Sequence, residues 1–169
     1  MKILTISGSS RSLSSNIQLL EALPFELPKH DFLRFKIEEL PLFTADADHH
    51  PWHPKILEWR SAVASADGVL ITTPEYIHNI PAALKNAFEW LTSSGELNYK
   101  PVVAITFTPH APRGKKAMQS LLWSLQALDA RVVVQLELYQ NEVEFNEEGR
   151  LITNEEVNVL KGAIELLIS

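Results

Sequence analysis

A serine-rich turn near the start of the chain has the composition of an anion-binding site. The sequence Gly8-Ser9-Ser10-Arg11-Ser12-Leu13-Ser14-Ser15-Asn16 follows an apolar segment at 2–7. A turn between a strand and a helix offers backbone N–H groups, hydroxyls and the positive end of a helix dipole, and Arg11 adds a full charge. Because the turn lacks the lysine of a Walker loop and the third glycine of a dinucleotide fingerprint, a monophosphate is the favoured ligand. The alternative is an ordinary serine-rich connection whose hydroxyls cap the helix.

A second polar turn, at 74–80, follows the apolar segment 69–73. Pro74 restricts its backbone, Tyr76 offers a flat ring or a phenol to a planar ligand, and the amides of residues 75–78 can meet ring heteroatoms. His78 has two interpretations: a group beside the ligand or its second substrate, and a solvent-exposed turn residue.

The elements that must position these turns alternate along the chain. Strands are predicted at 2–7, 31–37, 69–73, 102–107 and 131–138, and helices at 16–23, 55–65, 79–94, from the turn 108–113 to about 127, and at 154–168. Pro24 is expected to end the first helix, and Asn79 to cap the third with Pro81 in its first turn. Residues 38–54 are expected to form a loop.

This alternation, with strands that are apolar on both faces, predicts an α/β fold in which helices cover both sides of a parallel sheet. Ligands of such sheets bind beyond the carboxyl ends of the strands, near the topological switch point. Three turns are therefore the places to look for a site: 8–16, 74–80 and 108–114.

The bulk composition predicts one compact domain over residues 1–169. The 15 basic residues are scattered and outnumbered by 21 acidic ones, so neither nucleic acid nor an anionic membrane is an expected partner. The chain runs from Met1 into an apolar stretch too short for a signal peptide or a membrane span, which makes the cytoplasm the expected location. Since there is no cysteine, redox chemistry requires a cofactor.

The histidine-rich segment Asp46-Ala47-Asp48-His49-His50, with His53 close behind it, has ligand types that suit a divalent metal. Its loop position and irregular spacing argue against a metal site. A loop over the sheet or at a subunit boundary is expected instead.

Two motifs resemble those of the NADPH-dependent FMN reductase family. Gly8-Ser9-x-Arg11-x-x-Ser14-x-Asn16 is similar to its opening turn, and Pro74-Glu75-Tyr76 with Pro81-x-x-Leu84-Lys85-Asn86-Ala87 is similar to its second signature. The resemblance covers about residues 2–135 and implies a flavodoxin-like three-layer sandwich with strand order 2-1-3-4-5. It also implies that FMN is the cofactor.

The same resemblance implies which residues hold FMN. Its phosphate is expected on Ser9, Arg11, Ser14, Ser15 and Asn16. Its ring system is expected beside Pro74, Glu75, Tyr76, Ile77, Thr108, Pro109, His110 and Gly114. The family has asparagine where this chain has Ile77 and is rich in glycine where this chain has His110-Ala111-Pro112-Arg113-Gly114, so contacts to the ring are expected to differ.

Basic residues surround the third turn. Arg113, Lys115 and Lys116 stand at a helix start, where they oppose the helix dipole. They have two interpretations: contacts to the extra phosphate of NADPH or to an anionic reduced flavin, and solvated residues at a helix end.

The function implied by the resemblance is NAD(P)H-dependent oxidoreduction. The nicotinamide of NADPH or NADH delivers hydride to flavin N5 and leaves, and a small acceptor such as a flavin or a quinone takes the electrons in a ping-pong scheme; no residue of the chain is expected to act as a catalytic acid or base. The alternatives are an FMN-binding electron-transfer protein without NAD(P)H turnover and a flavin-free scaffold. A homodimer or homotetramer is expected, with the helix that carries Phe88, Trp90 and Leu91 as a candidate contact surface.

Overall fold

A computed structural model describes residues 1–167. Its centre is one parallel sheet of five strands in the order β2-β1-β3-β4-β5. The strands are β1 (Lys2–Ser7), β2 (Asp31–Phe35), β3 (Gly68–Thr73), β4 (Pro101–Thr108) and β5 (Arg131–Tyr139). Both the predicted fold class and the predicted strand order are confirmed.

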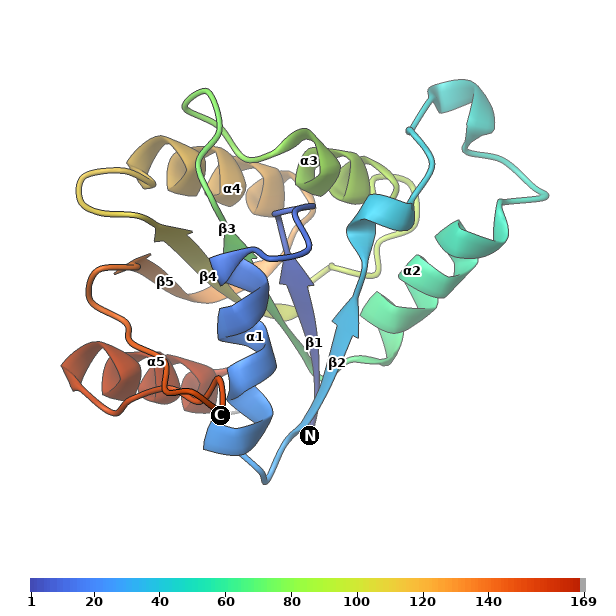
Figure 1. Cartoon of the computed structure of the whole chain (residues 1–169). Helices are drawn as coiled ribbons and strands as arrows, with labels where there is room; N and C mark the ends of the chain where they lie inside the picture. Colours follow the sequence, from blue (N-terminus) through green and yellow to red (C-terminus); the bar gives the residue numbers. More distant parts are fainter. Residues whose placement is uncertain (168–169) are drawn as a thin grey trace.

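Helices cover both faces of this sheet (Figure 1). They are α1 (Ser15–Glu26), α2 (Pro54–Ser65), α3 (Ala82–Glu89), α4 (Lys115–Ala127) and α5 (Glu155–Leu166). Short 3-10 turns at Ile37–Glu39 and Ala45–Ala47 interrupt the segment predicted as a loop. The last helix is predicted to extend to residue 168, and that residue lies outside the described residues. No helix within residues 1–167 has the length and apolar character of a membrane span.

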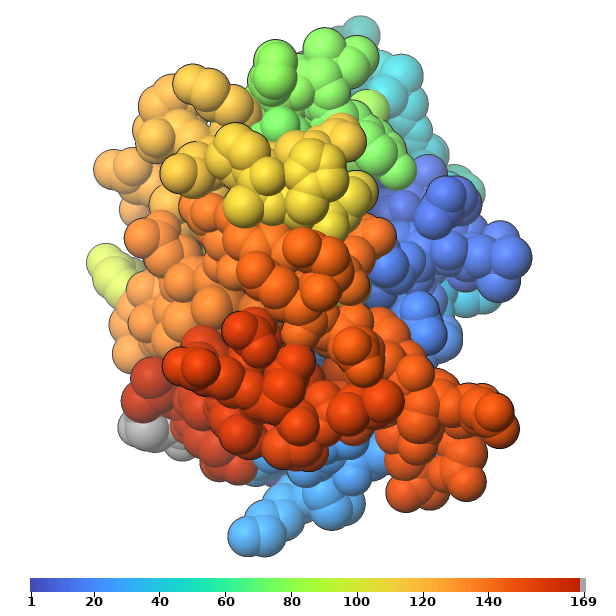
Figure 2. Space-filling model, turned by 60° about the vertical axis from the view of Figure 1, so that its left-hand side comes forward, coloured from blue at the N-terminus to red at the C-terminus, as the bar shows by residue number. Residues whose placement is uncertain are grey.

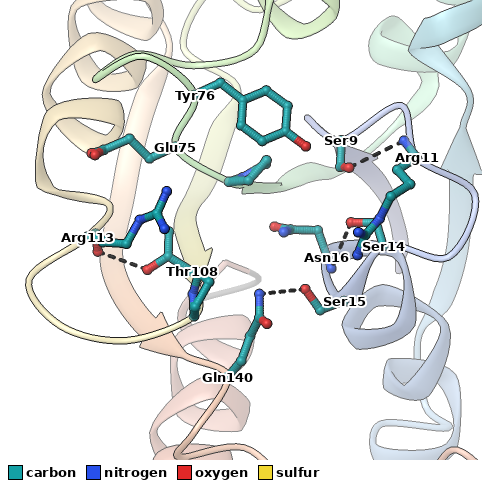
Figure 3. A pocket seen from close by; sticks show the side chains of 12 residues that line it. Ser9, Arg11, Ser14, Ser15, Asn16, Glu75, Tyr76, Thr108, Arg113 and Gln140 are labelled. Atoms are coloured by element: carbon teal, nitrogen blue, oxygen red, sulfur yellow. Dashed lines mark hydrogen bonds between the residues drawn. The ribbon is translucent and has the colours of Figure 1, made fainter.

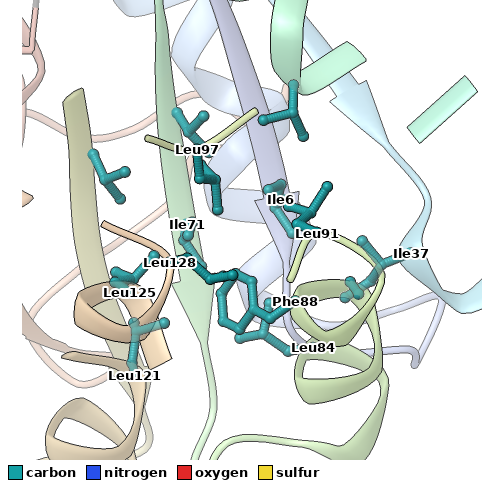
Figure 4. Close-up of a cluster of buried hydrophobic side chains, with 14 of the residues drawn as sticks. Ile6, Ile37, Ile71, Leu84, Phe88, Leu91, Leu97, Leu121, Leu125 and Leu128 are labelled. Atoms are coloured by element: carbon teal, nitrogen blue, oxygen red, sulfur yellow. The ribbon is translucent and has the colours of Figure 1, made fainter. Parts of the chain in front are cut away.

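Two cores explain why the strands are apolar on both faces. On one face Leu4, Ile71 and Ala104 pack against α2, α3 and α4. Figure 4 shows Ile71 of this core near Phe88 of α3. On the other face Ile3 and Leu70 pack against α1 and α5. Since successive side chains of a strand point to opposite faces, each inner strand fills both cores.

The prediction that Pro24 ends the first helix is wrong. Pro24 lies inside α1, which continues to Glu26, and Leu27 donates its N–H to the carbonyl of Leu23 at 2.9 Å. Proline costs an interior helix one hydrogen bond. Here the burial of Leu19, Leu20 and Leu23 against the sheet outweighs that cost.

The predicted helix 79–94 is too long at both ends. Asn79 does not cap it, because the Asn79 side chain accepts from the N–H of Ile80 and the hydroxyl of Ser120, and Pro81 is extended at the helix start. At the other end the carbonyl of Trp90 accepts from the guanidinium of Arg60, at 2.9 and 3.1 Å, in place of a backbone N–H one turn further on. The predicted strand 31–37 is also shorter, because Ile37 turns into a 3-10 helix and is buried.

The strand order places the topological switch point at β1. The strand β1 pairs with β2 on one side and with β3 on the other, both in parallel. The turns that follow β1 and β3 therefore open beside one another at the carboxyl edge of the sheet. The turn after β4 comes next, because β4 pairs with β3.

Candidate cofactor site

The first turn, between β1 and α1, is ordered by its own serines. The Ser7 hydroxyl accepts from the N–H of Ser9 at 3.1 Å, and the Ser9 hydroxyl accepts from the N–H of Arg11 at 3.4 Å. The Ser14 hydroxyl caps α1 by accepting from the N–H of Asn16 at 3.2 Å. A serine of this turn thus caps the helix, as the simpler interpretation requires. The turn also contains polar groups that have no hydrogen-bond partner within residues 1–167.

The first turn also has polar groups that are free to bind an anion. The N–H of Ser15 has no acceptor within residues 1–167, as is usual for the first residue of a helix. The side chain of Asn16 is buried; its Nδ2 donates to the carbonyl of Phe107 at 3.0 Å, while its Oδ1 has no partner in the described part of the chain. Arg11 is exposed, and within residues 1–167 its guanidinium donates only to the carbonyl of Leu13, at 3.3 Å. The N–H of Ser15, the second hydrogen of Asn16 Nδ2 and the Arg11 guanidinium are donors that a monophosphate can use, whereas Asn16 Oδ1 can only accept.

Gly8 has a steric role at the base of this turn. A Cβ atom at Gly8 would lie 2.6 Å from Oγ1 of Thr73 and 3.1 Å from a methyl group of Leu84. The N–H of Gly8 donates to the carbonyl of Thr72 at 2.7 Å, which brings β1 and β3 together where the first two turns begin. A side chain here would push the two turns apart.

The second turn contains a tight hairpin. Tyr76 and Asn79 exchange both backbone hydrogen bonds, at 2.9 and 3.0 Å, around Ile77 and His78. Both of these loop residues have positive φ, 51° and 58°, as a type I′ turn requires. The left-handed conformation is strained for a β-branched residue, and the Ile77 side chain is 98% exposed.

Glu75 fastens the second turn to the third. Its Oε2 accepts from the backbone N–H groups of Gly114, Lys116 and Ala117, at 3.1, 3.0 and 3.2 Å. The carboxylate points toward the start of α4 (Figure 3). It therefore occupies the anion site at this helix N-terminus with a group of the protein itself.

The environment of Glu75 favours its charged form. Burial by itself would raise the pKa of Glu75, but the N–H groups of Ala117, Lys116 and Gly114, together with His78, hold that pKa below its usual range. The Nδ1 atom of His78 lies 3.5 Å from Glu75 Oε1, and the His78 side chain is 83% exposed.

We expect Glu75→Gln to lower the free energy of unfolding at pH 7 by about 1.5 to 3 kcal/mol, the range for hydrogen bonds to a charged group. Because the pKa of Glu75 is lowered in the folded state, its stabilisation is complete above the unfolded pKa of about 4.3 and is lost as the pH falls through the folded value. Urea unfolding should therefore give a constant difference in the free energy of unfolding between the unmodified protein and Glu75→Gln above about pH 5.5. That difference should shrink in more acidic buffer. Glu147→Gln, at an exposed position, is the control. A difference that persists undiminished at low pH would show that the charge is not what stabilises the contact.

The third turn is closed by internal contacts. The Thr108 hydroxyl donates to the carbonyl of Arg113 at 2.9 Å, and the Arg113 N–H donates to the carbonyl of His110 at 3.1 Å. Gly114 has a φ of 106°, and a Cβ there would lie 2.8 Å from Thr106 Oγ1. The single glycine of this turn is thus at the one position that needs it.

The three turns surround one cavity of about 300 Å³ at the carboxyl edge of the sheet (Figure 3). On the surface, the third turn (yellow) lies beside the second (green) and close to the first (blue; Figure 2). The cavity is lined by Ser9, Arg11, Ser14, Ser15, Asn16, Pro74, Glu75, Tyr76, Thr108, Pro109, Arg113 and Gln140. The volume is at the low end for small-molecule pockets, and the cavity is open to solvent.

Most of the predicted site residues line this cavity, but five do not. Those outside it are Ile77, His78, His110, Gly114 and Lys115. Ile77 instead lines a neighbouring apolar hollow with Tyr76 and Ile80. Gly114 does not line the cavity, but its N–H donates to the carboxylate of Glu75, which does.

Gln140 lines the cavity and was not predicted. It follows β5 directly, and its side-chain amide donates to the Ser15 hydroxyl at 2.7 Å, so it joins the last strand to the first turn. The rule that ligands bind beyond the carboxyl ends of strands applies to β5 as well, so the residue after that strand could have been included.

The position of Glu75 changes the interpretation of the basic residues around α4. Lys115 and Lys116 begin a helix whose dipole disfavours them, but the Glu75 carboxylate accepts from backbone N–H groups at that helix N-terminus and so offsets the positive end of the dipole. A nucleotide phosphate is therefore not needed to explain the two lysines. Solvated residues at a helix end account for them.

The histidine-rich segment holds a loop in place. Asp48 forms a buried ion pair with Arg60, Nη2 to Oδ1 at 2.8 Å, and His53 caps α2 by accepting from the N–H of Lys55. The His50 ring packs at a tilt of 45° against Trp52, which also lies under the guanidinium of Arg60. Residues 1–167 contain no group of three or more side chains arranged to hold a metal ion.

Comparison with known proteins gives consistent matches. The sequence model described as NADPH-dependent FMN reductase matches residues 1–143. The chain is 34% identical over 159 residues to the NADH:(hydroxy)cinnamate reductase subunit CrdA of Vibrio ruber, with 90% of this chain and 78% of the relative covered. It is 32% identical over 138 residues to a quinone reductase of Escherichia coli, with 79% and 73% covered. Among solved structures, the flavoenzyme FerB, an NAD(P)H:(acceptor) oxidoreductase from Paracoccus denitrificans, superposes with a TM-score of 0.82 at 21% identity, with 98% of this chain and 94% of that chain covered.

Proposed function

The chain belongs to the NADPH-dependent FMN reductase family and is an oxidoreductase that uses FMN with NADH or NADPH, and we propose that the cavity between its three turns is the FMN site. In this proposal the phosphate lies on Ser9, Arg11, Ser14, Ser15 and Asn16. The ring system lies between the second turn, with Pro74 and Tyr76, and the third turn, with Thr108 and Pro109.

One observation carries this proposal. The same cavity joins a turn rich in anion donors to the aromatic face of Tyr76, although at least 60 residues separate the two in sequence. A ligand with a phosphate at one end and a planar ring at the other satisfies both ends. The buried Asn16 Oδ1, which has no partner within residues 1–167, is an acceptor and suits a hydroxyl donor of the ligand rather than a phosphate oxygen.

In the proposed reaction the chain binds and orients, and the cofactor carries the redox chemistry. When bound, FMN accepts a hydride from NAD(P)H and passes two electrons on. The first turn fixes one end of the cofactor, and Glu75 holds the second and third turns at a constant separation. The cavity is open to solvent, which suits alternate entry of nucleotide and acceptor in a ping-pong scheme.

We propose a small acceptor, such as a quinone or a free flavin. The name of the Escherichia coli relative supports a quinone. The rim of the cavity offers the phenol and ring of Tyr76, which is 49% exposed, as a surface for a second planar compound. Neither a nucleic acid nor a membrane is part of this proposal.

The proposal extends to a cytoplasmic location, where NAD(P)H is available, and to a homodimer or homotetramer. The contact surface suggested by the sequence is wrong, because Phe88, Trp90 and Leu91 are at most 2% exposed and belong to the core beneath α3. Trp123 on α4, 64% exposed, is a better candidate for a subunit contact. Small-angle scattering on Trp123→Ser and the unmodified protein would test this.

The function is tested by anaerobic titration of the purified, FMN-loaded protein with NADH and with NADPH. We expect the flavin absorbance near 450 nm to bleach with at least one of them and to return on addition of a quinone. FMN binding without bleaching would favour an electron-transfer protein, and failure to bind FMN would favour a flavin-free scaffold.

We expect Arg11→Ala to weaken FMN binding by about 1 to 3 kcal/mol, because a charge-assisted contact to the phosphate is lost. Fluorescence titration with FMN gives the two affinities, and riboflavin, which has no phosphate, is the control ligand. Arg34→Ala, which breaks an ion pair with Glu21 away from the cavity, is the matched variant. Equal losses for FMN and riboflavin would show that Arg11 does not act on the phosphate.

A further inference from the structure

The cavity has a second arginine, on the side opposite the phosphate turn. Arg113 lines the cavity from the third turn (Figure 3). Its backbone is fixed at both ends, because its N–H donates to the carbonyl of His110 and its carbonyl accepts from Thr108, whose side chain is buried. The backbone position from which the Arg113 side chain extends is therefore fixed at the cavity wall.

The charge of Arg113 is not neutralised by the protein. Within residues 1–167 its guanidinium makes neither an ion pair nor a hydrogen bond. Arg34 and Arg60, by contrast, are paired with carboxylates. Glu75, on the neighbouring turn, has one carboxylate oxygen bonded to three N–H groups of α4 and the other 3.5 Å from His78. An arginine stays protonated at any physiological pH, so this side of the cavity carries an uncompensated positive charge.

The third turn has few other donors for a ligand. Pro109 and Pro112 have no N–H, the N–H of Arg113 is bonded to His110, and that of Gly114 is bonded to Glu75. Only the N–H groups of His110 and Ala111 remain on this turn. The guanidinium of Arg113 is consequently the main hydrogen-bond donor that this wall presents to the cavity.

We infer that Arg113 stabilises the negative charge that the FMN ring gains on reduction, and so raises the reduction potential of the bound cofactor. This inference rests on the proposed position of FMN in the cavity. When the C–H bond of the nicotinamide breaks and its hydride forms the new N–H bond at flavin N5, two electrons and one proton are transferred. NAD(P)⁺ is left, and the ring gains one net negative charge. A guanidinium beside the ring, carried on a backbone that is held by hydrogen bonds, favours that charged product over the neutral oxidised ring.

The test is the two-electron midpoint potential of bound FMN, measured by anaerobic reductive titration against a reference dye. We expect Arg113→Gln to weaken binding of reduced relative to oxidised FMN by about 10- to 100-fold, which corresponds to a fall of roughly 30 to 60 mV in the potential. Arg113→Met, a second neutral variant, should give the same shift, and Arg113→Lys should restore most of the potential. Lys115→Gln removes the same charge two residues away, outside the cavity, and should shift the potential far less.

Two results would overturn this inference. An unchanged potential in both neutral variants, combined with a raised KM for NADPH but not for NADH, would assign Arg113 to the nucleotide phosphate. An unchanged potential with unchanged KM values would show that Arg113 neither stabilises the reduced flavin nor binds the nucleotide. Both are separate from failure of the proposed function, in which the unmodified protein neither binds FMN nor is bleached by NADH or NADPH.

Discussion

Asn16→Asp should nearly abolish FMN binding, with a loss of at least about 3 kcal/mol, or more than 100-fold in affinity. The substitution changes no volume, but it places a carboxylate at a position that is 1% exposed, in the proposed phosphate site. Two like charges about 5 Å apart at an effective dielectric constant of 20 repel by roughly 3 kcal/mol. The variant also loses the Nδ2 donor to the carbonyl of Phe107. Fluorescence titration with FMN measures the effect.

Gln18→Glu is the matched control for this prediction. It makes the same change of charge two residues further along α1, but on the exposed side of the helix and outside the cavity. We expect its affinity for FMN to be within a few-fold of that of the unmodified protein. If Asn16→Asp bound FMN as tightly as Gln18→Glu, the phosphate could not lie on the first turn.

The largest loss of stability is expected for Arg60→Met, at about 3 to 5 kcal/mol. Arg60 and Asp48 have only 7% and 10% of their side chains exposed. The guanidinium also donates to the carbonyl of Trp90 and to the hydroxyl of Ser93. Its removal leaves a buried carboxylate and a buried carbonyl without their donor, which costs more than the pair itself contributes. Urea unfolding at pH 7 measures the change.

Lys55→Met is the comparison for an exposed pair. Lys55 lies 2.8 Å from Glu58 and 3.0 Å from Glu39, but both pairs are open to solvent and should contribute less than about 1 kcal/mol. If Lys55→Met and Arg60→Met lost similar amounts of unfolding free energy, burial would not be what makes the contacts of Arg60 important for stability.

The fold was predictable because its signal is local. Runs such as Val69-Leu70-Ile71 are apolar at every position, which only a strand covered on both faces requires, and the alternation with helical segments does the rest. The errors come from contacts that are distant in sequence. Burial of α1 against the sheet overrides Pro24, and the guanidinium of Arg60 takes the carbonyl of Trp90 and helps to end α3.

Which residues line the candidate cavity was predictable where the contacts are local. The first turn could be identified from its serines because a helix N-terminus and its capping groups lie within nine residues. The partner of Glu75 could not, because the contact with α4 spans about 40 residues and leaves no local pattern. The contact between Gln140 and Ser15 spans 125 residues and likewise leaves no local pattern.

The hairpin in the second turn shows how a departure from the family can be understood once the backbone is known. Positive φ at Ile77 is a conformation that asparagine adopts readily and isoleucine does not. This turn therefore holds isoleucine in a conformation that asparagine, the residue of the family's pattern at this position, adopts more readily. Tyr76, next to it, remains at the edge of the cavity.

A crystal structure of the protein with FMN tests the central claim most directly. We predict that the phosphate lies within hydrogen-bond distance of Ser9, Ser14 or the Asn16 side chain, and that the ring lies between Tyr76 and Arg113. A phosphate bound at the start of α4, or a ring outside the cavity, would contradict the proposed site.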